Sequence, residues 1–243
     1  MVRAPVDGYT LLLAPAAGAV NATLYDNLPF NFIRDIAPVA GIVGVPLVMV
    51  VNPAFPARSV PDFITYVKTN PGKVSFASSG SGTLLHVAAE LFKMMAGVNM
   101  IHVPYRGTAP ALTDLLSGQV QVVFADMATS IDHVMAGRLR ALAVTTATRS
   151  PVLPNIATLS EYLPSIQVSS WYGIGAPRNT PTEIVDKLNR EINAGLAETR
   201  LKGRFTELGL IMLPGSPADF GHLIAEDIEK WGKVIRAANI RAE

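Results

Sequence analysis

The sequence has no cysteine, few charged residues and no long apolar run, and each shortage excludes a class of protein. Without cysteine there are no disulfides, thiolate metal sites or thiol nucleophiles. Charged residues make up 16% of the 243 positions, and 20 Lys and Arg against 19 Asp and Glu leave a net charge of +1. No basic field is available to neutralise a row of phosphates, so the composition argues against nucleic acid as a partner.

Two apolar segments are too short or too broken to span a membrane. Leu11–Val20 is interrupted by Pro15, and Gly41–Val51 by Pro46. A spanning helix needs about 20 consecutive apolar residues. Asp7 stands where a secretory leader would carry positive charge. We therefore expect no direct membrane insertion and no signal peptide in this chain.

The residues that are abundant predict an α/β fold. Hydrophobic residues make up 49% of the chain, and strand-like and helix-like patterns alternate along it. Such alternation predicts mostly parallel sheets flanked by helices. The predicted strands are Tyr9–Ala14, Leu47–Val51, Val74–Ala77, Met100–Val103, Val120–Phe124, Arg140–Thr145, Val168–Ala176 and Leu210–Leu213. The predicted helices are Pro61–Thr69, Leu84–Met95, Ala109–Leu116, Thr129–Ala136, a helix started by Thr180-Pro181-Thr182-Glu183, Leu201–Leu208 and a last helix from Ser216 to Ala238.

A loop rich in glycine and hydroxyl groups, SSGSGT at 78–83, joins a predicted strand to a predicted helix. Free backbone N–H groups and the helix dipole favour negative charge at such a position. Ser79, Gly80, Ser81, Gly82 and Thr83 are therefore candidates for binding an anion or a carboxylate. No lysine follows Gly82, and position 85 is leucine, so the loop matches neither a P-loop nor a dinucleotide fingerprint. The alternative is a capped turn with Thr83 as the N-cap.

An enzyme that uses this loop on an anionic substrate is a weaker alternative. A nucleophilic Ser81 within Gly-x-Ser-x-Gly needs glycine at positions 79 and 83, where serine and threonine stand. His86 is interpreted as a helix-surface or supporting residue, since no partner groups are arranged around it for catalysis. His86 and Glu90 lack further clustered metal ligands. The sequence thus predicts no enzyme, no cofactor and no metal.

Other candidates follow neighbouring strands. Tyr105 can wall a pocket or pack beneath it, and Arg106 can pair with a carboxylate or remain a solvated surface charge. Asp126 can accept a hydrogen bond in a cleft or cap the next helix. Ala17 and Gly18 follow the first strand, where backbone N–H groups can face a ligand; a simple turn of small residues is the alternative.

The order of these motifs resembles a known family along essentially the whole chain. The matching segments are DGYTLLLA (7–14), LYDNLPFNFIRDIAPVA (24–40), SSGSGTLLHVAAELFK (78–93), HVPYRGTAPALTDLLSGQVQVVFAD (102–126), GRLRALAVTTATRSPVLPNIATLSE (137–161) and WYGIGAPRNTP (171–181). They look like the Bug family, the TctC-like substrate-binding receptors of tripartite tricarboxylate transport systems.

The resemblance implies a fold like that of type II periplasmic binding proteins, with a ligand cleft between two domains. The first domain is expected to comprise 1–51 and 171–243, and the second 52–170. The implied ligand is a small organic carboxylate, held by the loop at 78–83 and, among other cleft-lining segments, by Asp126 and the turn at 16–18. The implied partners are membrane transporter subunits, and the implied location is the periplasm.

One departure from the family pattern concerns the beginning of the chain. Family members carry a signal peptide and a strand–helix–strand unit before the DGYTLLLA segment, whereas here Met1 stands six residues before Asp7. The first domain is therefore expected to be truncated, and the chain to be cytoplasmic if it is the complete product. A truncated, non-binding relative that acts through protein contacts is the corresponding alternative.

Overall fold

The computed structural model describes residues 1–25, 30–164 and 166–241, and these residues form two compact units. The first unit comprises Met1–Gly44 and the described chain from Ser170 to Arg241, and the second Val45–Ser169. The chain thus passes between the units near residues 44 and 170, whereas the expected boundaries followed residues 51 and 170. The first passage lies inside one long strand, β2 (Ile36–Val51).

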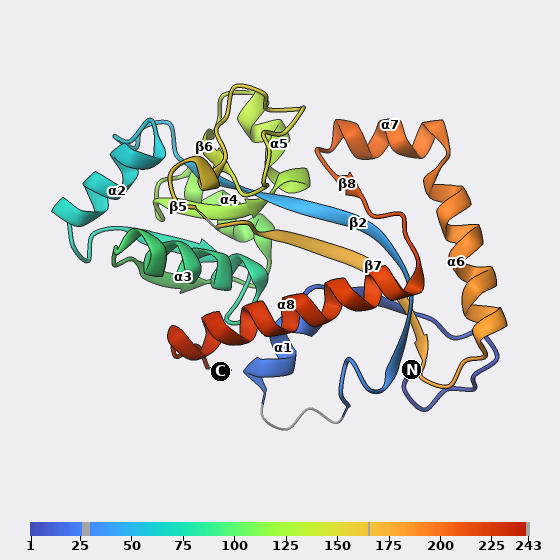
Figure 1. Ribbon diagram of the computed structural model, residues 1–243. Helices are drawn as coiled ribbons and strands as arrows, with labels where there is room; N and C mark the ends of the chain where they lie inside the picture. Colours follow the sequence, from blue (N-terminus) through green and yellow to red (C-terminus); the bar gives the residue numbers. More distant parts are fainter. Residues whose placement is uncertain (26–29, 165, 242–243) are drawn as a thin grey trace. The chain divides into compact units, whose positions relative to one another are not determined.

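The first unit contains a four-stranded arrangement and four helices. Its strands are β1 (Leu12–Pro15), the first part of β2, β7 (Ser169–Pro177) and β8 (Ile211–Met212). Its helices are α1 (Ala17–Leu24), α6 (Thr182–Leu196), α7 (Thr199–Glu207) and α8 (Pro217–Ala237). β7 lies between β1 and β2, β8 pairs with β2, and the β1–β7 and β2–β8 pairings are antiparallel. The red helix α8 packs against the blue helix α1 (Figure 1).

The core of the first unit forms where α8 covers one face of this sheet. Trp171 is 2% exposed and meets Phe220 of α8 edge to face, with ring centroids 5.4 Å apart. The indole Nε1 of Trp171 donates to Oδ2 of Asp227 at 2.6 Å, which satisfies a polar atom in an apolar setting. Trp171 therefore belongs to the core of the first unit.

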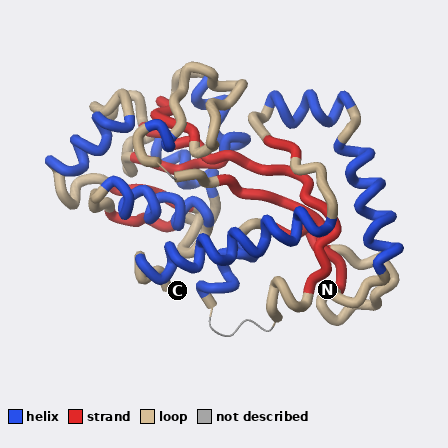
Figure 2. The backbone as a smooth tube through the Cα atoms, in the orientation of Figure 1, coloured by secondary structure: helices blue, strands red, loops and turns tan. Residues whose placement is uncertain are grey.

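The second unit alternates strands and helices (Figure 2). Its strands are the second part of β2, β3 (Ser75–Ser78), β4 (Ile101–Pro104), β5 (Val122–Asp126) and β6 (Arg140–Val144). Its helices are α2 (Val60–Thr69), α3 (Leu84–Ala96), α4 (Thr108–Leu116), α5 (Met127–Met135) and the short 3₁₀ helix η1 (Leu159–Glu161). The strand order is β4-β3-β5-β2-β6.

The predicted α/β class is confirmed, but the sheets are mixed rather than mostly parallel. β3 pairs in parallel with β4 and β5, as strand–helix–strand units require. β2 runs antiparallel to both β5 and β6 and lies between them. β5 and β6 therefore share a direction, but a strand from far away in the sequence separates them. The crossover rule fixes the direction of successive strands and does not reveal which strand is inserted between them.

Burial explains why the strand at 47–51 reads as an unbroken apolar run. Leu47, Val48, Met49, Val50 and Val51 are all 0% exposed. Both faces of this strand are covered, so no polar residue alternates with the apolar ones. The buried Thr145 hydroxyl and the Leu47 backbone N–H are 3.0 Å apart in a hydrogen bond at one end of the run.

Candidate functional site

The predicted residues of the second unit follow three strands that point the same way. The loop at 79–83 follows β3, Tyr105 follows β4, and Asp126 ends β5. Because β3 is parallel to both neighbours, these three positions share the carboxyl-terminal edge of the sheet. Backbone hydrogen bonds tie the first two segments together, from Tyr105 N–H to the Ser78 carbonyl at 3.0 Å and from Gly107 N–H to the Ser79 carbonyl at 3.3 Å.

Two glycines give the loop its course. Gly80 has a φ of 136° and Gly82 a φ of 73°, both in the region that side chains disfavour. The carbonyl of Gly80 accepts from the Thr83 hydroxyl at 2.7 Å and from the Thr83 N–H at 3.3 Å. Thr83 is the N-cap residue of α3, as the alternative interpretation held, but its side chain makes no capping hydrogen bond. Its hydroxyl turns back into the loop instead.

The start of α3 therefore keeps a group of backbone donors without acceptors. The N–H groups of five residues make no hydrogen bond with any described residue: Ser79, Ser81, Leu84, Leu85 and His86. The first-turn N–H groups of a helix are unpaired within the helix and carry its positive dipole end. Ser79 and Ser81 are partly exposed. This arrangement can accept a negatively charged oxygen.

Among the predicted residues at this sheet edge, Asp126 provides a carboxylate that can accept a hydrogen bond. It is the N-cap residue of α5, yet its carboxylate makes no capping hydrogen bond, and its nearest recorded donor is the Thr108 hydroxyl at 3.5 Å. Burial raises the pKa of Asp126, and the contact with Thr108 opposes that shift. A half-buried carboxyl group with one long hydrogen bond retains capacity for a further donor.

The polar groups of Tyr105 and Arg106 are not positioned to bind a ligand at this sheet edge. The Tyr105 hydroxyl donates to Oδ2 of Asp114 at 2.6 Å. Burial and this hydrogen bond raise the pKa of Tyr105 to about 12. Its hydroxyl is thus already engaged, and only the ring remains to wall a site. Arg106 is exposed and forms no ion pair within the described part of the chain, so it fits the solvated surface charge.

Ala17 and Gly18 lie in the first unit, at the start of α1. The N-cap residue Ala16 has no side chain that can cap the helix, and its own N–H bonds to the Trp171 carbonyl at 2.9 Å. The N–H groups of Ala17 and Gly18 have no acceptor among the described residues. A Cβ on Gly18 would lie 2.5 Å from the Phe32 ring, so packing alone requires glycine here. The binding role of both residues stays a prediction.

The polar support beneath the loop was predicted in part, for His86 but not for His102. Of the two interpretations of His86, the supporting role fits the structure and the helix surface does not: His86 is 7% exposed and its Nδ1 accepts a hydrogen bond from the Gly82 N–H, 3.0 Å away. His102 Nε2 lies 2.7 Å from the Ser78 hydroxyl. His86 lies in the first turn of α3, four residues after Gly82, and this short separation in sequence is the signal that could have shown the contact.

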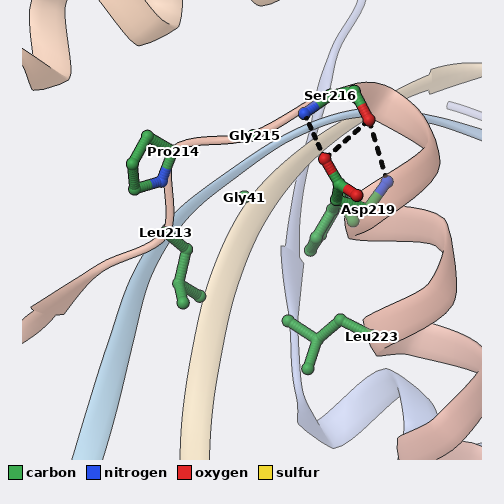
Figure 3. A pocket seen from close by; sticks show the side chains of 8 residues that line it. Gly41, Leu213, Pro214, Gly215, Ser216, Asp219 and Leu223 are labelled. Atoms are coloured by element: carbon green, nitrogen blue, oxygen red, sulfur yellow. Dashed lines mark hydrogen bonds between the residues drawn. The ribbon is translucent and has the colours of Figure 1, made fainter.

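Two surface pockets lie in the first unit, and neither is lined by a predicted site residue. One of about 230 Å³ is lined by Gly41, Leu213, Pro214, Gly215, Ser216, Asp219, Phe220 and Leu223 (Figure 3). The other, of about 460 Å³, is lined by Asp7, Gly8, Tyr9, Glu183, Ile184, Lys187, Leu188 and Glu191. In the first, Ser216 and Asp219 already satisfy one another, with the Ser216 N–H and hydroxyl 2.8 and 2.7 Å from Asp219 Oδ2.

Among the described residues, no three His, Asp or Glu side chains lie close enough together to hold a metal ion. Across the same residues, none of the helices is both long and apolar enough to cross a bilayer. What the second unit offers is a set of backbone donors and one half-buried carboxyl group at a sheet edge. Ligands of open α/β folds bind at this edge, beyond the carboxyl ends of the strands.

Comparisons with known proteins identify the family. The model of the tripartite tricarboxylate transporter family receptor matches residues 1–240, and the chain belongs to this family. The chain is 34% identical over 237 residues to protein BugT of Bordetella pertussis, covering 96% of this chain and 73% of BugT. The predicted resemblance to Bug receptors is thereby confirmed, and the chain is a receptor rather than an enzyme.

Solved structures agree with this assignment. The Rhodopseudomonas palustris protein Rpa4515 with adipate superposes with a TM-score of 0.90 at 36% identity, covering 99% of this chain and 81% of that one. MatC from the same organism, with bound malate, gives a TM-score of 0.85 at 29% identity, covering 96% of this chain and 81% of MatC.

Proposed function

We propose that this protein is a periplasmic receptor that binds a small organic carboxylate and delivers it to membrane subunits of a tripartite tricarboxylate transporter. The observation that carries the proposal is the set of five unpaired backbone N–H groups at the start of α3, those of Ser79, Ser81, Leu84, Leu85 and His86. A carboxylate has lone pairs for several such donors, and the helix dipole adds a favourable interaction with its charge.

The chemistry of the site favours a carboxylate over a phosphate. The loop has no lysine like that of a P-loop, and the one nearby arginine, Arg106, is exposed. Backbone donors without a paired cation suit an anion of modest charge. The two ligands held by the related structures, adipate and malate, are both dicarboxylates.

Each predicted residue has a role in this proposal. Ser79, Ser81 and the residues that start α3 supply N–H donors, while Gly80, Gly82 and Thr83 shape the loop. Asp126 accepts a hydrogen bond from a ligand hydroxyl or from a water molecule that bridges to it. The Tyr105 ring forms a wall. The N–H groups of Ala17 and Gly18, in the first unit, are proposed to bind a carboxylate oxygen.

A ligand screen tests the proposal. Thermal unfolding is measured with adipate, malate, citrate, glutamate and benzoate, and with adipamide as the uncharged match of adipate. At 100 times its Kd, a bound ligand raises the free energy of unfolding by about 2.7 kcal/mol. At least one carboxylate is expected to raise the melting temperature while adipamide does not. A melting temperature that no carboxylate raises, confirmed by calorimetric titration, contradicts the proposal.

A further inference from the structure

Two stacked imidazole rings lie beneath the candidate anion loop. The rings of His86, from α3, and His102, from β4, are 3.8 Å apart between centroids and only 10° from parallel. Phe76 of β3 continues the stack, with its centroid 4.8 Å from that of His102. The predicted site residues include neither histidine, and neither imidazole side chain has a role in the proposed binding chemistry.

The contact between His86 and the loop fixes the state of the ring. The Gly82 N–H donates to His86 Nδ1 at 3.0 Å. Only an unprotonated Nδ1 can accept, so the ring must be neutral with its hydrogen on Nε2. The hydrogen bond also uses the Gly82 N–H, which leaves the N–H groups of Ser79 and Ser81 as the loop's unpaired donors.

His102 supports the other end of the same loop. Its Nε2 lies 2.7 Å from the hydroxyl oxygen of Ser78, a residue that is 0% exposed. The same oxygen accepts from the Gly80 N–H at 3.2 Å and lies 3.0 Å from the Gly80 carbonyl. The stacked pair thus contacts the loop at both Gly80, through Ser78, and Gly82.

The charged groups around His86 do not favour a positive ring. His102 faces it from β4, and Glu90 and Lys93 lie on its own helix. Glu90 Oε1 is 3.8 Å from His86 Nε2, but it is already paired with the Lys93 ammonium at 2.7 Å. Burial, His102 and Lys93 together lower the pKa of His86 from 6.5 to about 3.

We propose that His86 is a positioning residue for ligand binding: its neutral ring, stacked on His102, holds the loop at 79–83 in the conformation that presents the remaining N–H groups to a carboxylate. A proton on Nδ1 breaks the bond to Gly82 and places a cation against a second imidazole. Acid therefore opens the loop and weakens binding. This inference rests on the proposed function.

The ligand-free protein provides the first test. Long-range proton–nitrogen NMR spectra of the imidazoles report which nitrogen carries hydrogen. His86 is expected as the Nε2–H tautomer, without titration between pH 7 and 5. An Nδ1–H tautomer, or a titration midpoint near 6.5, overturns the proposal with no reference to any ligand.

Paired substitutions provide the second test. His86→Asn keeps an acceptor, Oδ1, at the place of Nδ1, whereas His86→Leu removes it; exposed His222→Asn is the control. Hydrogen exchange at the Gly82 amide is expected to accelerate at least tenfold in His86→Leu and to stay within threefold of wild type in His86→Asn. The Kd for adipate and malate is expected to follow the same pattern. Unchanged Gly82 exchange in His86→Leu overturns the inference.

The two proposals fail in different ways. A wild-type protein that binds no carboxylate contradicts the proposed function, while the tautomer and the Gly82 exchange still decide whether His86 positions the loop. If His86→Leu does not fold, the imidazole spectra of the wild type and the Gly82 exchange of His86→Asn decide whether His86 positions the loop. Tight adipate binding by a folded His86→Leu overturns the positioning role alone.

Discussion

The starts of α3 and α8 have hydroxyl residues as N-caps but use them in opposite ways. At α8, in the first unit, the Ser216 hydroxyl accepts from the Asp219 N–H at 3.2 Å, and the Asp219 carboxylate accepts from the Ser216 N–H at 2.8 Å. At α3, in the second unit, Thr83 turns its hydroxyl to the Gly80 carbonyl. The capping hydroxyl thus satisfies a first-turn donor at α8, whereas at α3 no side chain does so, which separates a structural cap from a candidate binding site.

The largest expected effect is the loss of stability that the buried, neutral His86 causes as pH falls. In the unfolded chain this histidine takes up a proton below its ordinary pKa of 6.5, but in the folded protein only near 3. The unfolded state binds more protons in that window, so the free energy of unfolding falls as pH falls, by about 1.4 kcal/mol per pH unit. At pH 4.5 the loss relative to pH 7 is about 2–3 kcal/mol.

Denaturant unfolding of wild type and His86→Asn between pH 7 and 4 measures this contribution. Asp126, whose raised pKa acts in the opposite direction, is present in both proteins and cancels in the difference. The curve for His86→Asn is expected to fall less steeply, while His222→Asn follows wild type. Parallel curves for wild type and His86→Asn contradict a neutral, buried His86.

The second prediction concerns the backbone of the loop. Gly82→Ala places a side chain at a φ of 73°, which costs about 1–2 kcal/mol of stability. Because the loop conformation also aims the unpaired N–H groups, the Kd for a carboxylate is expected to rise at least tenfold. Gly97 ends the same helix at a φ of 61° with open space around it. Gly97→Ala is thus the matched control: similar loss of stability, unchanged Kd.

The third prediction sharpens the contrast from the α8 side. Ser216→Ala removes the cap and leaves the Asp219 N–H without its acceptor, so the free energy of unfolding is expected to fall by about 1 kcal/mol. Ligand affinity is expected to stay within twofold of wild type, since none of the predicted site residues lies on α8. Ser216→Thr, which retains a capping hydroxyl, is the control. A tenfold rise in the Kd of Ser216→Ala would show that α8 belongs to the binding site.

The α8 start was predictable from sequence, whereas the α3 start was only partly so. Ser216-Pro217 with Asp219 is a local capping pattern, and helix α8 begins where it predicts. A similar pattern at Thr180 marked a helix start less accurately, because the Thr180 hydroxyl bonds to the Pro177 carbonyl and Pro181 becomes the N-cap. At 78–83 the sequence predicts an anion loop. The support from His102 depends on a strand more than twenty residues away, so no local pattern reveals it.

Strand pairing shows the same limit on a larger scale. The apolar run at Leu47–Val51 predicts a buried strand, and the structure has one there. The strand actually begins at Ile36. Pro38, Gly41, Gly44 and Pro46 are atypical of a strand, so the sequence does not show that this segment is continuous with 47–51. β5 and β6 pair with the strand on either side. Strand propensity is assigned to each residue by itself. The length of a strand and its place in a sheet depend instead on pairing partners far away in the sequence.

The smallest expected effect tests Thr83, the residue on which the comparison of α3 and α8 depends. Thr83→Val keeps the shape of the side chain and removes the 2.7 Å hydrogen bond to the Gly80 carbonyl. The carbonyl retains its 3.3 Å bond from the Thr83 N–H, so the loss of stability is expected to be below about 1 kcal/mol. A loosened loop is expected to raise the Kd for a carboxylate about threefold to fivefold, roughly the same energy, and Thr83→Ser restores it. Hydrogen exchange in the later turns of α3 should stay unchanged, because the Thr83 side chain caps none of its N–H groups. If Thr83→Val instead lowers stability as much as Ser216→Ala and leaves the Kd unchanged, the two residues act alike and the start of α3 is an ordinary capped helix.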